Sequence, residues 1–191
     1  MGKWTRRAFI TSGVAAGGVV VFGVAIRRGD RSDKVRGLVA ADGESLFDVW
    51  LKIAPDNTIT AIIPHADMGQ GVHTALAMML ADELDADWSN VRFEEAPAHK
   101  EFANYSLARE FSAPGTDFPA WLIDSVDGLF FRATQMMGLQ ITGGSLSVRT
   151  TGQVAMRVTG AATRAVLLEA AANEWQVPVA ELSTGESMMR L

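Results

Sequence analysis

Two short glycine-bearing turns are the segments of this sequence best suited to hold a ligand. The first, Met68-Gly69-Gln70-Gly71, directly precedes a stretch with helical periodicity, and the second is Thr142-Gly143-Gly144-Ser145. Glycine leaves backbone N–H groups unhindered, and free N–H groups at the start of a helix attract an anion. The Gln70 amide and the Ser145 hydroxyl add polar contacts, so the two turns together suit a phosphate or a heteroaromatic cofactor. Glycine turns before helices are also common structural features, and the pattern alone leaves both interpretations open.

The three histidines are the residues most able to bind a metal ion or act as a base: His65, His73 and His99. Around the first turn, His65, Asp67 and His73 form only a loose ligand set, because no H-x-x-x-H pair shares a helix face. We therefore predict no metal site and interpret the histidines as polar loop or capping residues. A Ser-His-Asp triad is not excluded by count, but the G-x-S-x-G nucleophile motif is absent, and we predict no catalytic residue.

Four acidic residues gather at the end of the helical stretch that follows the first turn: Asp82, Glu83, Asp85 and Asp87. They resemble paired carboxylates for acid–base chemistry. Negative charge near a helix C-terminus opposes the helix dipole, which suggests that tertiary packing rather than propensity holds this helix. We interpret the cluster as a solvated acidic helix end.

Composition excludes several classes of function. The 191 residues include 17 Lys and Arg against 22 Asp and Glu, a net charge of −5 that argues against a nucleic-acid partner. The absence of cysteine excludes a disulfide framework, a thiol nucleophile and an iron–sulfur cluster held by this chain. The charge is unevenly distributed, because residues 1–41 carry +6 and residues 42–191 carry −11. We therefore predict two parts with a boundary between residues 41 and 42.

The N-terminal part has the layout of an export signal. Lys3, Arg6 and Arg7 precede an uncharged run over residues 9–26, and a charged linker follows. The order around the two arginines resembles the twin-arginine consensus, whose route exports folded proteins, and predicts a periplasmic location. The small residues Val39-Ala40-Ala41 offer a cleavage site, but an 18-residue run is long enough to remain as an inner-membrane anchor. Both outcomes stay open, as does an ordinary anchor that happens to contain Arg-Arg.

Hydrophobic periodicity and turn residues predict an α+β fold in which a β-hairpin and short strands pack with three helices. The expected elements are strands over 47–53 and 58–63, a loop over 64–70, a helix over 72–84, a strand over 91–94, a long loop over 96–119, a helix over 118–137, a glycine-rich turn over 141–147, a helix over 154–175, and a turn followed by a strand over 181–191. Within the second helix, we expect Met136 and Met137 to fill the core.

The residues around both glycine turns resemble the molybdenum hydroxylases, the family of xanthine oxidase and aldehyde oxidase. Residues 65–84 contain the segment M-G-Q-G-x-H-T, which is characteristic of this family. Residues 88–97 and 139–149, and the Ala-rich helix before Pro178, fit its exported branch. That branch contains the beta subunit of isoquinoline 1-oxidoreductase and membrane-bound aldehyde dehydrogenases. The resemblance covers nearly all of the chain and identifies it as part of a molybdopterin-binding domain.

The resemblance implies a molybdopterin cofactor, in its cytosine dinucleotide form, whose molybdenum is held by the pterin rather than by side chains. It implies that seven residues line this cofactor: Gly69, Gln70, Gly71 and Val72 along the pterin and its phosphate, and Gly143, Gly144 and Ser145 nearer the metal. The implied reaction hydroxylates a carbon of an aldehyde or an N-heteroaromatic substrate with water as the oxygen source. The implied partners are a small 2Fe–2S subunit and, in some members, a cytochrome c subunit.

The sequence also departs from the family pattern. Members of this type are several times longer, and the G-x-G-E motif that carries their glutamate base is absent here, as is a Gly-Phe-Gly segment. Leu146 replaces the usual threonine after Gly-Gly-Ser. We therefore expect an N-terminal fragment of a large subunit that is inactive alone. The alternatives are a non-catalytic periplasmic module that docks on an iron–sulfur partner, and an unrelated anchored protein whose glycine turns are structural.

Overall fold

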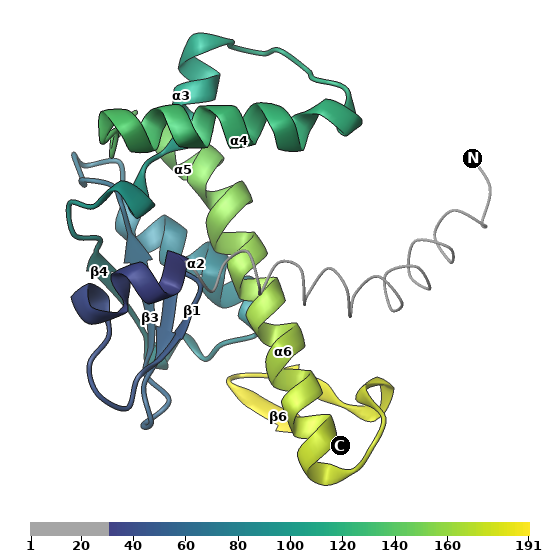
Figure 1. Cartoon of the computed structure of the whole chain (residues 1–191). Coiled ribbons are helices and arrows are strands. Elements are labelled where there is room, and N and C mark those ends of the chain that lie inside the picture. Colours follow the sequence, from purple (N-terminus) through teal and green to yellow (C-terminus); the bar gives the residue numbers. More distant parts are fainter. Residues whose placement is uncertain (1–30) are drawn as a thin grey trace.

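The computed structural model describes residues 31–191, and a small mixed sheet packed against one helix forms its centre (Figure 1). The four strands lie in the order β1 (Ser45–Phe47), β2 (Leu51–Ile53), β3 (Ile59–Ile63) and β4 (Val91–Glu95). The first three are antiparallel neighbours, and β4 runs parallel to β3. A parallel pair needs a crossover, which α2 (Val72–Leu84) supplies. The predicted α+β class is confirmed.

The helix α2 lies where its apolar stripe predicts it. Val72, Leu76 and Leu80 are fully buried and belong to the main core, together with residues of β2 and β3. The helix begins after Gly71 and ends at Asp85, both of which adopt left-handed backbone conformations that break the helical path. The short 3-10 helix η1 (Trp88–Asn90) then leads into β4.

The strand predicted over residues 47–53 is instead two strands joined by a tight reversal. Phe47 of β1 pairs with Leu51 of β2, and Asp48 between them has a left-handed φ of 58°. Val49 and Trp50 are buried although they lie in the turn, which gave the segment the alternation of a single strand. The predicted hairpin between β2 and β3 is confirmed.

The segment predicted as a long loop over residues 96–119 contains two helices. The 3-10 helix η2 (Lys100–Phe102) is followed by α3 (Tyr105–Ser112). Phe102 and Leu107 are fully buried and anchor these elements to the remainder of the fold. The prediction was wrong because α3 is short and presents few apolar residues inward, while the prolines that suggested a loop lie outside it.

A continuous helical run starts inside the second glycine turn and crosses α2. It consists of α5 (Ser145–Thr151), a π-helical segment η3 (Gly152–Arg157) and α6 (Val158–Trp175), so it begins earlier than the predicted helix. An added Cβ at Gly152 would lie 2.3 Å from the Met79 sulfur, and one at Gly160 would lie 2.6 Å from the Leu80 carbonyl oxygen. These two glycines therefore allow the run to approach α2 closely and fix their relative position.

The run ends in a small hairpin, where the sequence predicted a turn and one strand. The 3-10 helix η4 (Val179–Glu181) precedes β5 (Ser183–Gly185) and β6 (Met188–Arg190), which pair antiparallel. In Figure 1 this hairpin lies beside the lower end of α6. It also contacts the end of α2, because Ser187 N–H donates to the Asp85 carbonyl at 2.9 Å.

The helix α4 (Ala120–Met137) lies across one end of the molecule (Figure 1). It occupies the predicted range, but Thr134 is its only buried residue. Met136 is 89% exposed and Met137 is 62% exposed, so the prediction that this pair fills the core was wrong. The helix packs on α3, and Leu122, Val126 and Phe130 of its apolar stripe are half-buried, while Trp121 and Leu129 face solvent in the described part of the chain.

Residues 31–39 are also helical, and Val35 and Val39 belong to the main core. The predicted signal over residues 1–30 lies outside the described residues, and the boundary between residues 41 and 42 stays a prediction. Within residues 31–191, no helix is both long and apolar enough to cross a bilayer.

Candidate functional site

The fold brings the two glycine turns side by side, although about 75 residues separate them in the sequence. The backbone N–H of Ala66 donates to the Thr142 hydroxyl at 3.0 Å. The His65 ring and the Asn104 amide both bond to the carbonyl oxygen of Ile141, at 3.1 and 2.7 Å. The helices α2 and α5 that follow the two turns pack against each other. The turns therefore form one junction, which we call the glycine junction and define as residues 65–72 and 141–147.

The first turn is braced internally and leaves the start of α2 open. The Gln70 amide accepts from Met68 N–H and donates to the Ala66 carbonyl at 2.9 Å, and Asp67 accepts from Gly69 N–H at 2.8 Å. Gly71 caps the helix with its backbone at a φ of 67°, and no side chain caps it. The first helical turn has N–H groups without partners inside the helix, and such groups favour an anion.

The residues of the first turn that we predict to bind the cofactor differ in whether they are still free to make a contact. The Gln70 side chain is engaged within the turn itself, so its own amide is already paired. Gly69 and Gly71 have positive φ, and a Cβ added at either would meet nothing within 4 Å, which leaves their surroundings open to an approaching group. Whether these residues and Val72 contact a cofactor stays a prediction.

The second turn is held from behind by α3. An added Cβ at Gly143 would lie 2.9 Å from the Phe111 ring and 3.0 Å from Leu107, so the backbone of the turn packs closely against α3. The Gly143 N–H donates to the Ser147 hydroxyl at 2.7 Å. Gly144 has φ 57° and ψ −136°, a conformation suited to glycine, and Ser145 is exposed at the start of α5. The predicted glycine-rich turn therefore ends at Gly144, where the helix begins.

His65 joins both turns and the helical run. Its ring is buried, and its Nε2 lies 2.7 Å from the Thr151 hydroxyl while Nδ1 lies 3.1 Å from the Ile141 carbonyl. Nδ1 also lies 3.2 Å from the Asn104 side-chain amide nitrogen, so partners from three separate segments hold the ring. Burial lowers the pKa of His65 from 6.5 to about 4, against the opposing effect of the Ile141 carbonyl, so the ring is neutral at pH 7.

The other two histidines differ in their environment. His73 is buried, donates from Nε2 to the His65 carbonyl at 2.8 Å, and stacks on Phe93 with ring centres 4.7 Å apart. His99 caps η2 by accepting from Glu101 N–H. The loop or capping interpretation is confirmed for His99, which caps η2, and for His65, which lies in the predicted loop over residues 64–70. His65 and His73 are in addition buried and link separate segments. Among residues 31–191, no group of three or more His, Cys, Asp or Glu side chains is placed to hold a metal ion.

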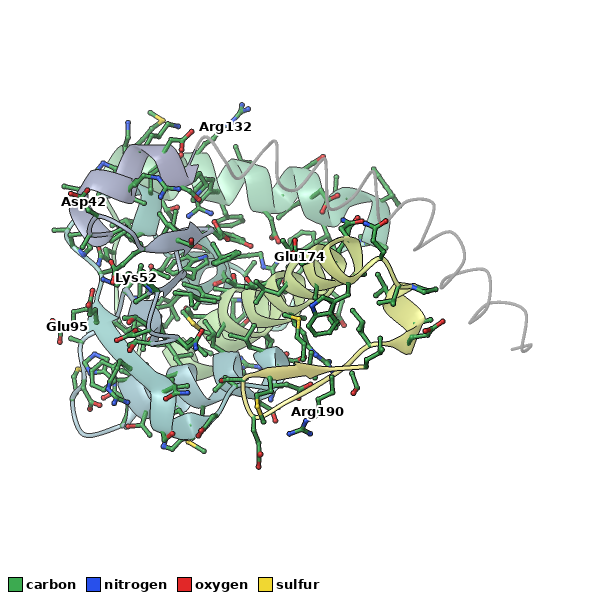
Figure 2. The ribbon with its side chains drawn as sticks, turned by 90° about the horizontal axis from the view of Figure 1, so that it is seen from below. Asp42, Lys52, Glu95, Arg132, Glu174 and Arg190 are labelled. Atoms are coloured by element: carbon green, nitrogen blue, oxygen red, sulfur yellow. The ribbon has the colours of Figure 1, made fainter. Side chains whose placement is uncertain are left out.

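A cleft of about 530 Å³ opens beside the glycine junction. Its wall includes His65 and Thr142 from the junction, His99 and Lys100 from η2, and Glu95 from the end of β4. Glu95 reaches the outer edge of the molecule (Figure 2). The Lys100 ammonium, the Thr142 hydroxyl and the Gln140 amide give this wall hydrogen-bond donors, and its carbonyl groups give acceptors, a mixture that fits a phosphate-bearing heteroaromatic group. The residues present therefore fit a pterin-type cofactor.

Three of the four acidic residues at the end of α2 form ion pairs with arginines of the helical run. Arg157 lies 2.6 Å from Glu83 and 3.3 Å from Asp82, and Arg164 lies 2.6 Å from Asp85. The fourth member, Asp87, caps η1 by accepting from Ser89 N–H at 2.9 Å. The Asp82 side chain is still 74% exposed, as expected for a solvated helix end, while Glu83 and Asp85 are half-buried in ion pairs. The sequence alone did not show that the helical run carries two arginines past this cluster.

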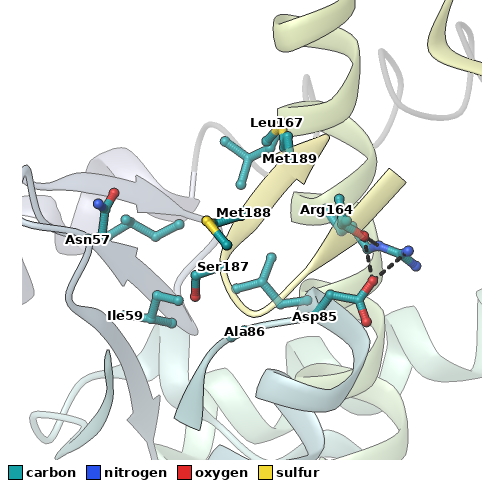
Figure 3. Close-up of a pocket in the computed structure, with 12 residues that line it drawn as sticks. Asn57, Ile59, Asp85, Ala86, Arg164, Leu167, Ser187, Met188 and Met189 are labelled. Carbon is teal, nitrogen blue, oxygen red and sulfur yellow. Dashed lines mark hydrogen bonds and ion pairs between the residues drawn. The ribbon is translucent and has the colours of Figure 1, made fainter. Parts of the chain in front are cut away.

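A second, smaller cavity of about 190 Å³ lies at the opposite end of α2 (Figure 3). Leu167 of α6, Ile59 of β3 and Met188 of the terminal hairpin line it, and the pair of Asp85 and Arg164 stands at its side. The 13 residues of α2 place it about 20 Å from Gly71. It is therefore separate from the glycine junction, and no sequence motif indicated it.

Comparisons with known proteins show what the chain is similar to. Residues 14–107 match the family model described as molybdopterin cofactor-binding domain. Over 98% of its length, the chain is 30% identical to isoquinoline 1-oxidoreductase subunit beta of Brevundimonas diminuta. Over 86%, it is 36% identical to a membrane-bound aldehyde dehydrogenase (pyrroloquinoline-quinone) of Gluconacetobacter polyoxogenes. The chain spans about a fifth of the length of these relatives, 20% and 17%.

The fold is of the α+β class, and the family model that matches residues 14–107 describes a molybdopterin cofactor-binding domain. On these matches, the chain belongs to the molybdenum hydroxylase family. The matched family model includes the first glycine turn but ends before the second, which only the two relatives cover.

Proposed function

We propose that the chain supplies part of the cofactor cradle of an exported molybdopterin oxidoreductase that hydroxylates aldehydes or N-heteroaromatic compounds. One observation carries the proposal: two glycine-started helices, neither capped by a side chain, meet at the hydrogen bond from Ala66 to Thr142. A junction of this kind offers backbone donors from two directions. The family membership supplies the chemical class of the ligand.

The proposal assigns a role to the main residues of the glycine junction. The backbone N–H groups after Gly71 bind a phosphate of the cofactor, while Gln70 keeps the turn rigid and does not bind directly. Ser145 and the open backbone at Gly144 face the pterin. Neutral His65 holds the two turns at a fixed spacing. When bound, the cofactor supplies the molybdenum centre at which the substrate carbon is hydroxylated.

Loading of the purified chain with molybdopterin cytosine dinucleotide tests the binding role. Gly71→Ala places a side chain at a φ of 67° in the junction, and Gly115→Ala places one at a φ of 64° in a remote loop. Both substitutions carry a similar backbone strain and meet nothing within 4 Å. We expect Gly71→Ala to weaken binding at least tenfold, as measured by native mass spectrometry, and Gly115→Ala to leave it unchanged. Equal binding by both variants contradicts the proposal.

Pyrroloquinoline quinone serves as a second probe in the same experiment, because the name of one relative includes it. We expect the junction to prefer the molybdopterin, whose phosphates match the donors at the start of α2. If the chain bound the quinone more tightly than the molybdopterin, and Gly71→Ala abolished that binding, the junction would be a site for a different class of cofactor. Turnover of an aldehyde by the chain alone would contradict the expectation that it supplies only part of the active site.

The exposed α4 stripe favours a second function, in which the chain is a non-catalytic docking module for a small 2Fe–2S subunit. Trp121 is 79% exposed and Leu129 is 69% exposed, and apolar surface of this kind marks interaction sites. A pull-down with such a subunit distinguishes the two functions. Under docking alone, Trp121→Glu abolishes capture, Trp175→Glu on α6 does not, and the captured complex contains no molybdenum. A cytochrome c subunit serves as the second bait.

The proposed location is periplasmic, by the twin-arginine route, with or without an inner-membrane anchor. Its support is the sequence order Arg6-Arg7 followed by the uncharged run over residues 9–26. We expect the double substitution Arg6→Lys and Arg7→Lys to block export, because that route reads the arginine pair. Cell fractionation followed by immunoblotting measures the effect. Unchanged export of the double variant would indicate a different route.

A further inference from the structure

The helix formed by residues 31–39, which we call the linker helix, contacts three separate parts of the fold. The Arg31 Nε lies 3.2 Å from the Glu101 carboxylate in η2, and its Nη2 donates to the Glu101 carbonyl. The same guanidinium lies 4.7 Å from the centre of the Phe131 ring in α4 and 5.9 Å from that of Trp50 beside β2. A segment that the sequence marks as a charged linker thus joins the sheet, η2 and α4.

Glu101 depends on the linker helix for its neutralisation. Its side chain is 2% exposed, and its charged partners are Arg31 at 3.2 Å and Lys34 at 3.7 Å, both on the linker helix. Among the described residues, the carboxylate also accepts from the neutral amide of Gln135, at 3.0 Å. Loss of the linker helix would leave a buried carboxylate without either cation, which is strongly unfavourable in a protein interior.

The apolar face of the linker helix is part of the core. Val35 is fully buried and Val39 is nearly so, and both pack in the cluster that contains α2 and β3. The Val39 carbonyl accepts from the Lys52 ammonium at 2.9 Å, and Lys52 is itself buried between Glu44 at 3.1 Å and Glu94 at 3.0 Å. The end of the linker helix therefore completes the hydrogen bonding of the buried Lys52 ammonium (Figure 2).

We infer that the linker helix is a permanent part of the folded domain, so any proteolytic removal of the export segment cuts before Arg31. The small-residue site at Val39-Ala40-Ala41 is not used, because a cut there detaches Arg31, Val35 and the Val39 carbonyl from their partners. This inference goes beyond the proposed function and does not depend on cofactor binding. Only four residues separate Ile26 from Arg31, a span of about 15 Å when extended. A retained apolar run therefore keeps the domain at the membrane surface.

Engineered cleavage of the full chain in detergent tests the inference directly. One version carries a specific protease site between Ala41 and Asp42, and the matched version carries it between Gly29 and Asp30. We expect cleavage after residue 29 to leave Tm within about 2 °C of the uncut protein. We expect cleavage after residue 41 to lower Tm by about 10 °C or more, with peptide 1–41 released only as the protein unfolds. Release of that peptide from a domain with unchanged Tm would overturn the inference.

Two substitutions on the linker helix provide an independent measurement. Val35→Asp puts a charge into the core, and Leu38→Asp puts the same charge on a residue that is 58% exposed. We expect Val35→Asp to open residues 31–44 to limited proteolysis at least tenfold faster than in the unaltered chain, and Leu38→Asp to leave the rate unchanged. The intact mass of the exported chain then gives the natural N-terminus, which we expect at or before Arg31. An exported, folded chain that begins at residue 40, 41 or 42 would contradict the inference.

Discussion

The helices α2 and α4 carry similar apolar stripes but differ in what covers them. Seven of the 13 residues of α2 are buried between the sheet and the helical run, whereas one of the 18 residues of α4 is buried. Figure 1 shows the same contrast, because α2 lies within the fold and α4 lies across its end. Periodicity therefore reports that a helix has an apolar face and does not report whether this chain covers that face.

The difference separates residues that determine stability from residues that are free to contact another protein. Around α2, the helical run approaches closely at Gly152 and Gly160, where an added Cβ would meet Met79 and the Leu80 carbonyl oxygen. Around α4, Trp121, Leu129 and Met136 present apolar surface that no described residue covers. Substitutions in the first region should alter folding, and those in the second should alter association.

Truncation of a leucine in each helix should give the largest contrast. Leu76→Ala removes a fully buried side chain from the core of α2, and we expect a loss of about 2–5 kcal/mol in the free energy of unfolding. Leu129→Ala removes an exposed side chain from α4, and we expect a change within about 0.5 kcal/mol. Urea denaturation measures both. Comparable losses would mean that α4 is covered in solution.

Acidification should destabilise the junction at the start of α2. The pKa of His65 is lowered to about 4 by burial, so between pH 6.5 and pH 4 the unfolded chain binds a proton that the folded chain does not. Stability is therefore lost as the pH falls through this window, by about 2 kcal/mol between pH 7 and pH 5. Denaturation of the unaltered chain and of His65→Gln measures this effect. A dependence of equal size in His65→Gln would assign it to other groups.

A glycine-to-alanine pair tests the close approach of the two helices. Gly160→Ala sets a Cβ 2.6 Å from the Leu80 carbonyl oxygen, and we expect a loss of about 1–3 kcal/mol because backbone must move. Gly128→Ala in α4 meets nothing within 4 Å, and we expect a gain of about 0.5–1 kcal/mol from helix propensity. Thermal unfolding should move in opposite directions. A stabilising Gly160→Ala would contradict the close packing.

The sequence predicted elements whose signals are local and missed those that depend on tertiary partners. The stripe and the flanking Gly71 located α2 well, and the turn residues around Asp56 located the hairpin of β2 and β3. The reversal at Asp48 was missed because the turn contains buried apolar residues, and these gave the sequence the alternation of apolar and polar residues that is typical of a strand. The helix α3 was missed because it is short and flanked by prolines.

The candidate site was predicted in its positions but not in its connections. Both glycine turns carry a recognisable motif, and the fold brings them together as the resemblance implies. The role of His65 had no local signal, because its partners Ile141 and Thr151 are more than 70 residues away. The internal pairing of Gln70 was equally hidden, since motif matching locates a side chain and does not show which bonds it makes.

The central claim is that the two glycine turns form one binding junction, and amide NMR shifts report on both turns at once. In a titration of the chain with molybdopterin cytosine dinucleotide, we expect the amides of Gly69, Gly71, Gly144 and Ser145 to shift along a single binding curve. In Gly71→Ala, the shifts in both turns should weaken together. Shifts confined to one turn, or centred on the distant cavity beside Leu167 and Met188, would contradict the claim.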